Sequence, residues 1–315
     1  MLKRFSILPA LLICALEAVA QDHPPRDKLI LPLLASSTAA TAVAPAAAIE
    51  FAIIKTADMT TREGLTFSGG DYTKRIKLQH VAVLVRHPQG SFLFDSGLGK
   101  KVDQQVKADT PFWAKPFASY GAVTPARTQI EGTGLPLPSR IILSHAHWDH
   151  ASGLVDFPDS EVWVNAAEKM FLNTPHAGGV LASQINAPST KWVTYEFQAK
   201  PYQLFAQSLD LFGDGSAVLV PLIGHTPGST GLYVTLKSGK QYFFVGDVVW
   251  NAAAIKDERP KMWLASKIAD NDQDRTLESV VLLHRLQQAN PQLVIVPAHD
   301  ASVQDGIGYF PKFVQ

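Results

Sequence analysis

Residues 144–150 read Ser-His-Ala-His-Trp-Asp-His, and this segment restricts the fold and the chemistry more than any other part of the chain. It directly follows a short apolar run that we predict to be a strand. Side chains alternate along an extended chain, so His145 and His147 point to one side, and a turn after them brings Asp149 and His150 to an adjacent point. Imidazoles and a carboxylate this close together are typical ligands for two neighbouring borderline cations. A packing or surface role explains them poorly, because buried charges need partners; a mononuclear site is the stronger alternative.

Four further segments place an Asp or a His directly after a predicted strand: Phe94-Asp95-Ser96-Gly97, Gly224-His225-Thr226-Pro227-Gly228-Ser229, Gly246-Asp247 and Pro297-Ala298-His299. Each segment alone is a weak signal. Together, and in this order around residues 145–150, they resemble the motifs of the metallo-β-lactamase superfamily, whose signature is His-x-His-x-Asp-His. The resemblance extends from about Asp95 to His299.

The resemblance implies an α+β fold, an αββα four-layer sandwich with metals at one edge between two sheets. It also implies three histidines on a first metal, an aspartate and two histidines on a second, and one bridging aspartate, in the order His145, His147, His225; Asp149, His150, His299; Asp247. The residues agree with this set, because the ligand loops each follow an apolar strand and four strand ends can converge on one place.

The remaining ionisable residues are assigned less specific roles. Asp95 is either a carboxylate that orients a ligand histidine or a simple turn residue. Five histidines have no partner at ligand spacing, and we expect them to be ordinary surface or hydrogen-bonded residues: His23, His80, His87, His176 and His284.

The ligand set predicts two zinc ions, with manganese, cobalt and iron as alternatives. Two such ions about 3.5–4 Å apart hold a hydroxide near neutral pH and polarise the carbonyl or phosphoryl group that it attacks. We expect Asp247 to bridge the ions. Asp149 is expected to orient the hydroxide and to pass a proton to the leaving group.

The substrate follows less directly from the sequence. An Asp at the bridging position, here Asp247, resembles the lactonases, phosphotriesterases and thioesterases of the superfamily, whereas its true β-lactamases commonly have another residue type there. Acyl-homoserine lactonases typically have a Tyr three positions after this Asp, where this chain has Trp250, whose indole donates a hydrogen bond but does not exchange a proton. We expect Trp250 to contact substrate, and Trp113 and Phe117 either to form an apolar wall for it or to pack a loop onto the sandwich.

These features favour a small apolar ester or lactone as substrate. We therefore expect a lactonase-like hydrolase. The alternatives are a phosphotriesterase, an aryl esterase or a β-lactamase on the same site, or a non-catalytic binding protein that keeps the fold.

The amino-terminal sequence predicts a targeting signal. Residues 1–20 are predicted to be a signal peptide, residues 21–48 a Pro- and Ala-rich linker or arm, and residues 49–315 the hydrolase domain. Cleavage before Gln21 removes Cys14, the single cysteine, and leaves no thiol ligand or disulfide. We expect a periplasmic or secreted protein with no membrane contact after cleavage. The 28 basic and 28 acidic residues give no net charge for nucleic acid binding.

Apolar runs bounded by turn residues predict many short strands and a few helices. The predicted strands are 50–55, 80–86, 91–95, 140–143, 161–164, 193–196, 208–211, 217–221, 232–236, 241–245 and 293–296, and the predicted helices are 166–172 and 275–288. Strand clusters flanked by helices indicate two packed sheets with helices outside. The 46% hydrophobic content supports a substantial core.

Overall fold

The structure is a computed structural model that describes residues 48–174 and 179–315. The predicted signal peptide and all but the last residue of the predicted linker lie outside the described residues, as does His176. Among the described residues, no helix combines the length and the apolar composition that crossing a bilayer requires.

Within the described ranges, the strands form one sheet of six and one of five. The first has the order β1-β2-β3-β4-β5-β6, with β1 (Glu50–Arg62), β2 (Arg75–His87), β3 (Gly90–Phe94), β4 (Arg140–Ile142), β5 (Glu161–Asn165) and β6 (Lys191–Tyr195). The second has the order β11-β10-β9-β8-β7, with β7 (Leu209–Asp210), β8 (Ala217–Pro221), β9 (Thr230–Thr235), β10 (Gln241–Phe244) and β11 (Val294–Val296). Strands β3 to β6 run parallel, as do β10 and β11, whereas the other pairs are antiparallel.

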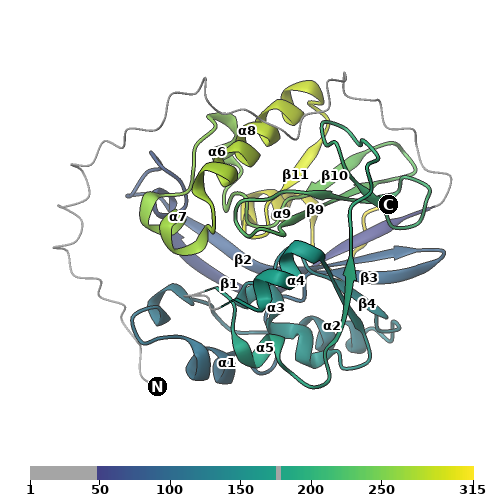
Figure 1. The fold of residues 1–315 in the computed structure, drawn as a ribbon, viewed down its shortest axis with the longest axis horizontal. Coiled ribbons are helices and arrows are strands. Elements are labelled where there is room, and N and C mark those ends of the chain that lie inside the picture. Colours follow the sequence, from purple (N-terminus) through teal and green to yellow (C-terminus); the bar gives the residue numbers. More distant parts are fainter. Residues whose placement is uncertain (1–47, 175–178) are drawn as a thin grey trace. The chain divides into compact units, whose positions relative to one another are not determined.

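Helices cover the outer faces of both sheets. The helices of the described residues are α1 (Val102–Asp109), α2 (Ala126–Gly132), α3 (Trp148–Ala151), α4 (Ala166–Leu172), α5 (Ala182–Ile185), α6 (Ala253–Lys256), α7 (Trp263–Ala269), α8 (Gln273–Ala289) and α9 (Ala301–Ile307), with short 3-10 turns at Glu63–Leu65, Lys115–Phe117 and Ser152–Asp156. Helix α9 differs from the outer helices, because its Val303 and Ile307 pack against the apolar cluster between the sheets. Helices α6 and α8 lie on one side of the paired sheets and α1 to α5 on the opposite side (Figure 1).

Strand periodicity explains why the sheets stack in this way. On β2, Val83 and Val85 enter the apolar cluster between the two sheets, whereas Ala82 and Leu84 enter the cluster beneath the outer helices. Residues 217–220 of β8 alternate in the same manner between the inner cluster and the cluster under α8. A strand that is buried on both faces needs a nearly continuous apolar sequence, and each fully buried Val or Leu contributes about 1.5–3 kcal/mol. The predicted four-layer α+β sandwich is confirmed.

The predicted strand ends were wrong at the first hairpin. Strand β1 continues past residue 55 to Arg62, and β2 begins at Arg75 rather than at His80. The extra ladder pairs polar residues with one another, such as Thr60 with Lys77. Its side chains are mostly exposed or half-buried, so the apolar alternation that marks a strand is weak there.

Chain topology brings the motif loops together. The segment after β4 carries His145 and His147, the segment after β8 carries His225, the segment after β10 carries Asp247, and the segment after β11 carries His299. These strands come from both sheets, so the loops meet where the two sheets adjoin.

Candidate metal centre

Three histidines form the first group of ligand atoms. His145, His147 and His225 are buried, and one nitrogen of each lies within 4.8 Å of the others. The Nε2 atoms of His145 and His225 are 3.1 Å apart, although the residues lie on loops of different sheets. Burial holds the pKa values of His145 and His147 well below the usual range, and repulsion between neighbouring histidines lowers them further. Neutral imidazoles are the form that binds a cation.

Two carboxylates and two further histidines form the second group. His299 Nε2 is 3.2 Å from Asp149 Oδ2 and 3.0 Å from Asp247 Oδ1, and His150 Nε2 is 3.2 Å from Asp247 Oδ1. Burial alone would raise the pKa values of both carboxyl groups, but the neighbouring histidines hold them well below the usual range. Both aspartates are therefore ionised near neutral pH.

Asp247 lies between the two groups. Its Oδ2 is 3.7 Å from His225 Nε2 of the first group, while its Oδ1 faces His150 and His299. The structure thus brings together all seven residues expected as ligands. Which of them binds which ion stays a prediction.

The donor atoms fit divalent cations. His150 Nε2 and Asp247 Oδ1 are buried and face each other, yet neither has a hydrogen-bond partner among the described residues. The far nitrogens of three ligand rings are occupied: His150 Nδ1 donates to Asp95 Oδ2 at 2.8 Å, His225 Nδ1 to Asp270 Oδ1 at 2.8 Å, and His299 Nδ1 to the Gln79 carbonyl at 2.6 Å. These bonds leave the Nε2 lone pairs directed into the centre, as in known metal sites.

Asp95 is both a turn residue and a partner of the ligand loop. It has a positive φ of 61°, and its carboxylate accepts hydrogen bonds from the Ser144 N–H at 2.7 Å and the Ser144 hydroxyl at 2.8 Å, in addition to His150. The two roles that the sequence left open are therefore compatible. A positive φ in a residue other than glycine costs about 1–3 kcal/mol, which these bonds offset.

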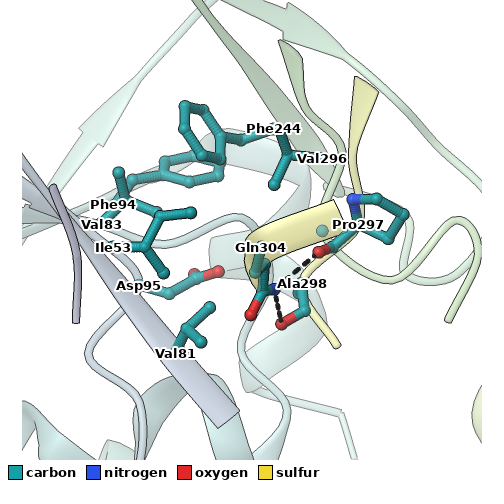
Figure 2. Close-up of a pocket in the computed structure, with 11 residues that line it drawn as sticks. Ile53, Val81, Val83, Phe94, Asp95, Phe244, Val296, Pro297, Ala298 and Gln304 are labelled. Carbon is teal, nitrogen blue, oxygen red and sulfur yellow. Dashed lines mark hydrogen bonds between the residues drawn. The ribbon is translucent and has the colours of Figure 1, made fainter. Parts of the chain in front are cut away.

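Helix α9 supports the loop that carries His299. Gln304 of α9 is fully buried and donates from its amide to the carbonyls of Pro297 and Ala298, both at 3.0 Å. Figure 2 shows Gln304 and Asp95 at a cavity of about 10 Å³ whose other walls are mainly apolar side chains of the two sheets. Asp95 and Gln304, which support the ligand loops, therefore border the apolar core between the sheets.

A buried ion pair supports His225 and was not found by sequence reasoning. Lys261 donates to Asp270 Oδ1 at 2.7 Å and to the Val248 carbonyl at 3.2 Å, and both charged side chains are 1% exposed. Burial alone would raise the pKa of Asp270, but Lys261 and His225 lower it to about 2. A single Lys and a single Asp nine residues apart carry no motif, so the sequence offered no signal.

Glu168 joins two ligand loops and was also missed. Its Oε1 accepts the Ala146 N–H at 2.7 Å, and its Oε2 accepts the Thr226 hydroxyl at 2.7 Å and the Gly228 N–H at 3.2 Å. Asn165 caps α4 and Glu168 follows three residues later, a spacing that resembles an ordinary capping box. The side chain instead reaches the loops of His145 and His225.

Trp250 lies beside Asp247. Its indole N–H donates to Asp247 Oδ2 at 2.8 Å, and the Lys261 ammonium lies 5.6 Å from its ring centre. The N–H is therefore engaged with a ligand rather than free for substrate. Contact between substrate and the ring stays a prediction.

The two aromatic residues expected as an apolar wall, Trp113 and Phe117, are about half exposed. Trp113 is 49% and Phe117 53% exposed, and both belong to the segment around the 3-10 turn Lys115–Phe117. This segment reaches the metal centre through the carbonyl of Ser119, which lies 3.1 Å from His80 Nε2. A wall for substrate and a loop-packing role both stay predictions for these two side chains.

Three of the five histidines without assigned ligand roles belong to the described residues, and these three differ from one another. His87 donates to Asp214 at 3.1 Å and His284 contacts the Ile255 carbonyl at 3.1 Å, which are ordinary hydrogen-bonded roles. His80 is different, because it is buried and its Nδ1 lies 3.1 Å from Asp149 Oδ2. Sequence spacing gave His80 no partner, and only the sheet brings it to the centre.

Comparison with known proteins gives consistent matches. The model of the metallo-beta-lactamase superfamily matches residues 75–299. The N-acyl homoserine lactonase AttM of Rhizobium radiobacter is 23% identical over 240 residues, which cover 73% of this chain and 85% of that protein. A probable metallo-hydrolase of Mycobacterium tuberculosis is 31% identical over 198 residues, covering 57% of this chain and 60% of that protein.

The fold also matches a solved enzyme structure. An N-acyl homoserine lactone hydrolase, with the product N-hexanoyl-L-homoserine bound at its catalytic metal centre, superimposes with a TM-score of 0.64 at 17% identity. The match covers 84% of this chain and 98% of that one.

Proposed function

Because the chain belongs to the metallo-β-lactamase superfamily, we propose that it is a dinuclear zinc hydrolase that opens lactones. One observation carries the two-metal proposal: Asp247 lies within 3.7 Å of His225 in one ligand group and within 3.2 Å of His150 in the other. The lactone is supported by relatives that are named N-acyl homoserine lactonases and match 73% of the chain.

The bound cations would be held by His145, His147, His225, Asp149, His150, His299 and Asp247. When bound, two divalent ions supply a Lewis acid for the carbonyl oxygen and lower the pKa of water towards neutrality. The protein's own groups provide the remaining chemistry. Asp149 is ionised and lies at the centre, so it can accept the proton of the attacking water and return it to the leaving alkoxide.

Trp250 favours a second candidate substrate. An indole does not exchange a proton, and its N–H already donates to Asp247. Asp149 is then the proton donor that the residues around the centre offer to a leaving alkoxide. Substrates whose leaving group needs no proton, such as aryl esters and phosphotriesters, depend less on such a donor, and we keep them as the alternative.

Activity on matched substrates tests both candidates. The zinc-loaded protein is incubated with N-decanoyl-homoserine lactone, with a lactone of a phenol and with a phenyl ester, and products are followed by mass. The Asp247→Asn variant serves as the blank. Opening of the aliphatic lactone that depends on Asp247 supports the lactonase. Turnover of the phenolic substrates alone would move the assignment to the second candidate, and activity retained in Asp247→Asn would refute the two-metal mechanism.

We further propose that the protein is exported. The support is the Lys3-Arg4 pair, the apolar run and the Ala18-Val19-Ala20 site at its amino terminus. The test is the mass of the protein recovered from the periplasm and the medium of a bacterial host. A mature chain that begins at Gln21 is expected, and an intact amino terminus in the cytoplasm would contradict export.

A further inference from the structure

We propose that His80 is a positioning residue that fixes Asp149 and couples it to residues 111–121, the segment that carries Trp113 and Phe117. The inference deepens the proposed function, because it assigns a role in placing both a metal ligand and a candidate substrate wall. It rests on the contacts of a single buried side chain.

Both ring nitrogens of His80 are engaged. Nδ1 lies 3.1 Å from Asp149 Oδ2 and Nε2 lies 3.1 Å from the Ser119 carbonyl oxygen, and the residue is 3% exposed. A carbonyl oxygen and an ionised carboxylate oxygen both accept hydrogen bonds. The ring therefore lies between the two acceptors with one nitrogen facing each, and Nδ1 faces the Asp149 oxygen that also faces His299.

The backbone of β2 explains how His80 reaches the centre. Alternation directs Ala82 and Leu84 to the helical side of the sheet, and His80 has the same parity, which brings it to Asp149 of α3. The ladder with β1 shifts register between Lys55 and Ala57, directly opposite His80. Such a bulge re-aims side chains next to functional sites. The Thr56 hydroxyl lies in this bulge and donates to the His80 carbonyl at 2.8 Å.

The preceding residue of the same strand holds a second ligand. The Gln79 carbonyl accepts from His299 Nδ1 at 2.6 Å, and the Gln79 N–H donates to the His299 carbonyl at 3.0 Å. Consecutive residues of β2 thus position Asp149 and His299. The ligand pair is fixed to the first sheet and does not depend on its own loops alone.

His80 also connects Asp149 and His299 to residues 111–121. The Ser119 carbonyl bonds to the His80 ring, and the Trp148 ring centre lies 5.5 Å from that of His80 and 5.8 Å from that of Tyr120. Ser119 and Tyr120 therefore pack against the ligand loop. Trp113 and Phe117 project from the same segment and are about half exposed.

Two substitutions separate the two contacts. In His80→Asn the side-chain amide reaches the place of Nδ1, so the contact with Asp149 is kept and the contact with Ser119 is lost. In His80→Gln the amide reaches the place of Nε2, so the reverse holds. His87→Asn is the matched control, because His87 lies on the same strand but bonds to Asp214.

The first measurement is metal affinity, which needs no substrate. Zinc is titrated against a competing chelator, and the second equivalent is expected to bind about 10- to 100-fold more weakly in His80→Gln, as for other residues that support a ligand. His80→Asn and His87→Asn are expected to bind as the wild type does. Equal loss in His80→Asn and His80→Gln, or no loss in His80→Gln, would overturn the role in positioning Asp149.

The second measurement is hydrogen exchange of the peptide that spans residues 112–121. His80→Asn is expected to exchange about fivefold faster there than the wild type, the factor that one net hydrogen bond contributes, and to raise KM for an apolar substrate without lowering kcat. Unchanged exchange would overturn the coupling. Both measurements remain decisive if the wild type binds two metals but opens no lactone, so failure of the proposed function is distinguishable from failure of this inference.

Discussion

Replacing Glu168 by glutamine tests whether the carboxylate that joins the loops of His145 and His225 is held at an energetic cost. Glu168 is 1% exposed, and burial raises its pKa from 4.5 to about 7 even though hydrogen bonds from Thr226 and Ala146 oppose the shift. Below pH 4.5 the group is protonated in both the folded and the unfolded chain. Between pH 4.5 and about 7 the Glu168 carboxyl ionises in the unfolded chain but stays protonated in the folded chain, so folding stability falls as pH rises.

The size of the effect follows from the shift. Each pKa unit corresponds to about 1.4 kcal/mol, so the shift from 4.5 to about 7 destabilises the folded state by about 3 kcal/mol at pH 8. Glu168→Gln has no ionisable group at this position, so this destabilisation is absent from the variant. Its free energy of unfolding relative to the wild type should therefore rise by about 3 kcal/mol between pH 4 and pH 8.

Urea unfolding of the metal-free protein, followed by tryptophan fluorescence across this pH range, measures the difference. Removing metal eliminates the contribution of cation binding, and all other titrations cancel between the two proteins. Glu168→Ala is the second variant, because it leaves the N–H groups of Ala146 and Gly228 without their acceptor at every pH. If the difference in free energy of unfolding between the wild type and Glu168→Gln does not change with pH, the reasoning is refuted.

Three further substitutions test the support of the centre. In Gly228→Ala the new Cβ would lie 2.2 Å from a backbone nitrogen, so we expect a loss of about 1–3 kcal/mol in urea unfolding, whereas Gly132→Ala, which meets nothing within 4 Å, should not destabilise. Lys261→Met leaves the Asp270 charge buried and unpaired, and should cost about 3–5 kcal/mol together with weaker zinc binding in a chelator titration. Trp250→Phe keeps an aromatic ring but removes the N–H donated to the Asp247 carboxylate, together with part of the indole; we expect weaker binding of the second zinc, and unchanged binding would assign Trp250 to packing or to substrate alone.

The expected ligands could be selected from the sequence because they lie in the segments that follow strand ends. A strand that is buried on both faces leaves a continuous apolar run, and the ionisable residue after it stands out. The residues 145–150 also carry four ligands in one segment, so their proximity needed no tertiary information.

Apart from Asp95, the supporting residues were not predictable, because the fold alone brings them close. His80 and Asp149 are 69 residues apart, Glu168 and Thr226 are 58 apart, and His225 and Asp270 are 45 apart. Each sits in a local pattern with an ordinary explanation, such as a strand position for His80 or a helix cap for Glu168. Their partners follow from sheet stacking and register, which local periodicity does not encode.

The supporting contacts come from the first sheet and from the segment after α7. Asp95 follows β3 and holds His150, Gln79 lies in β2 and holds His299, and Asp270 follows α7 and holds His225. Each acceptor is fixed by its own packing before any cation binds, so the ring orientations are set by the protein. Because a ligand that is already oriented loses little freedom on binding, this arrangement favours tight metal binding. It also divides the carboxylates near the centre between two positions: Asp149 and Asp247 lie among the nitrogens of the expected ligand histidines, while Asp95 and Asp270 accept hydrogen bonds from the far side of a histidine ring.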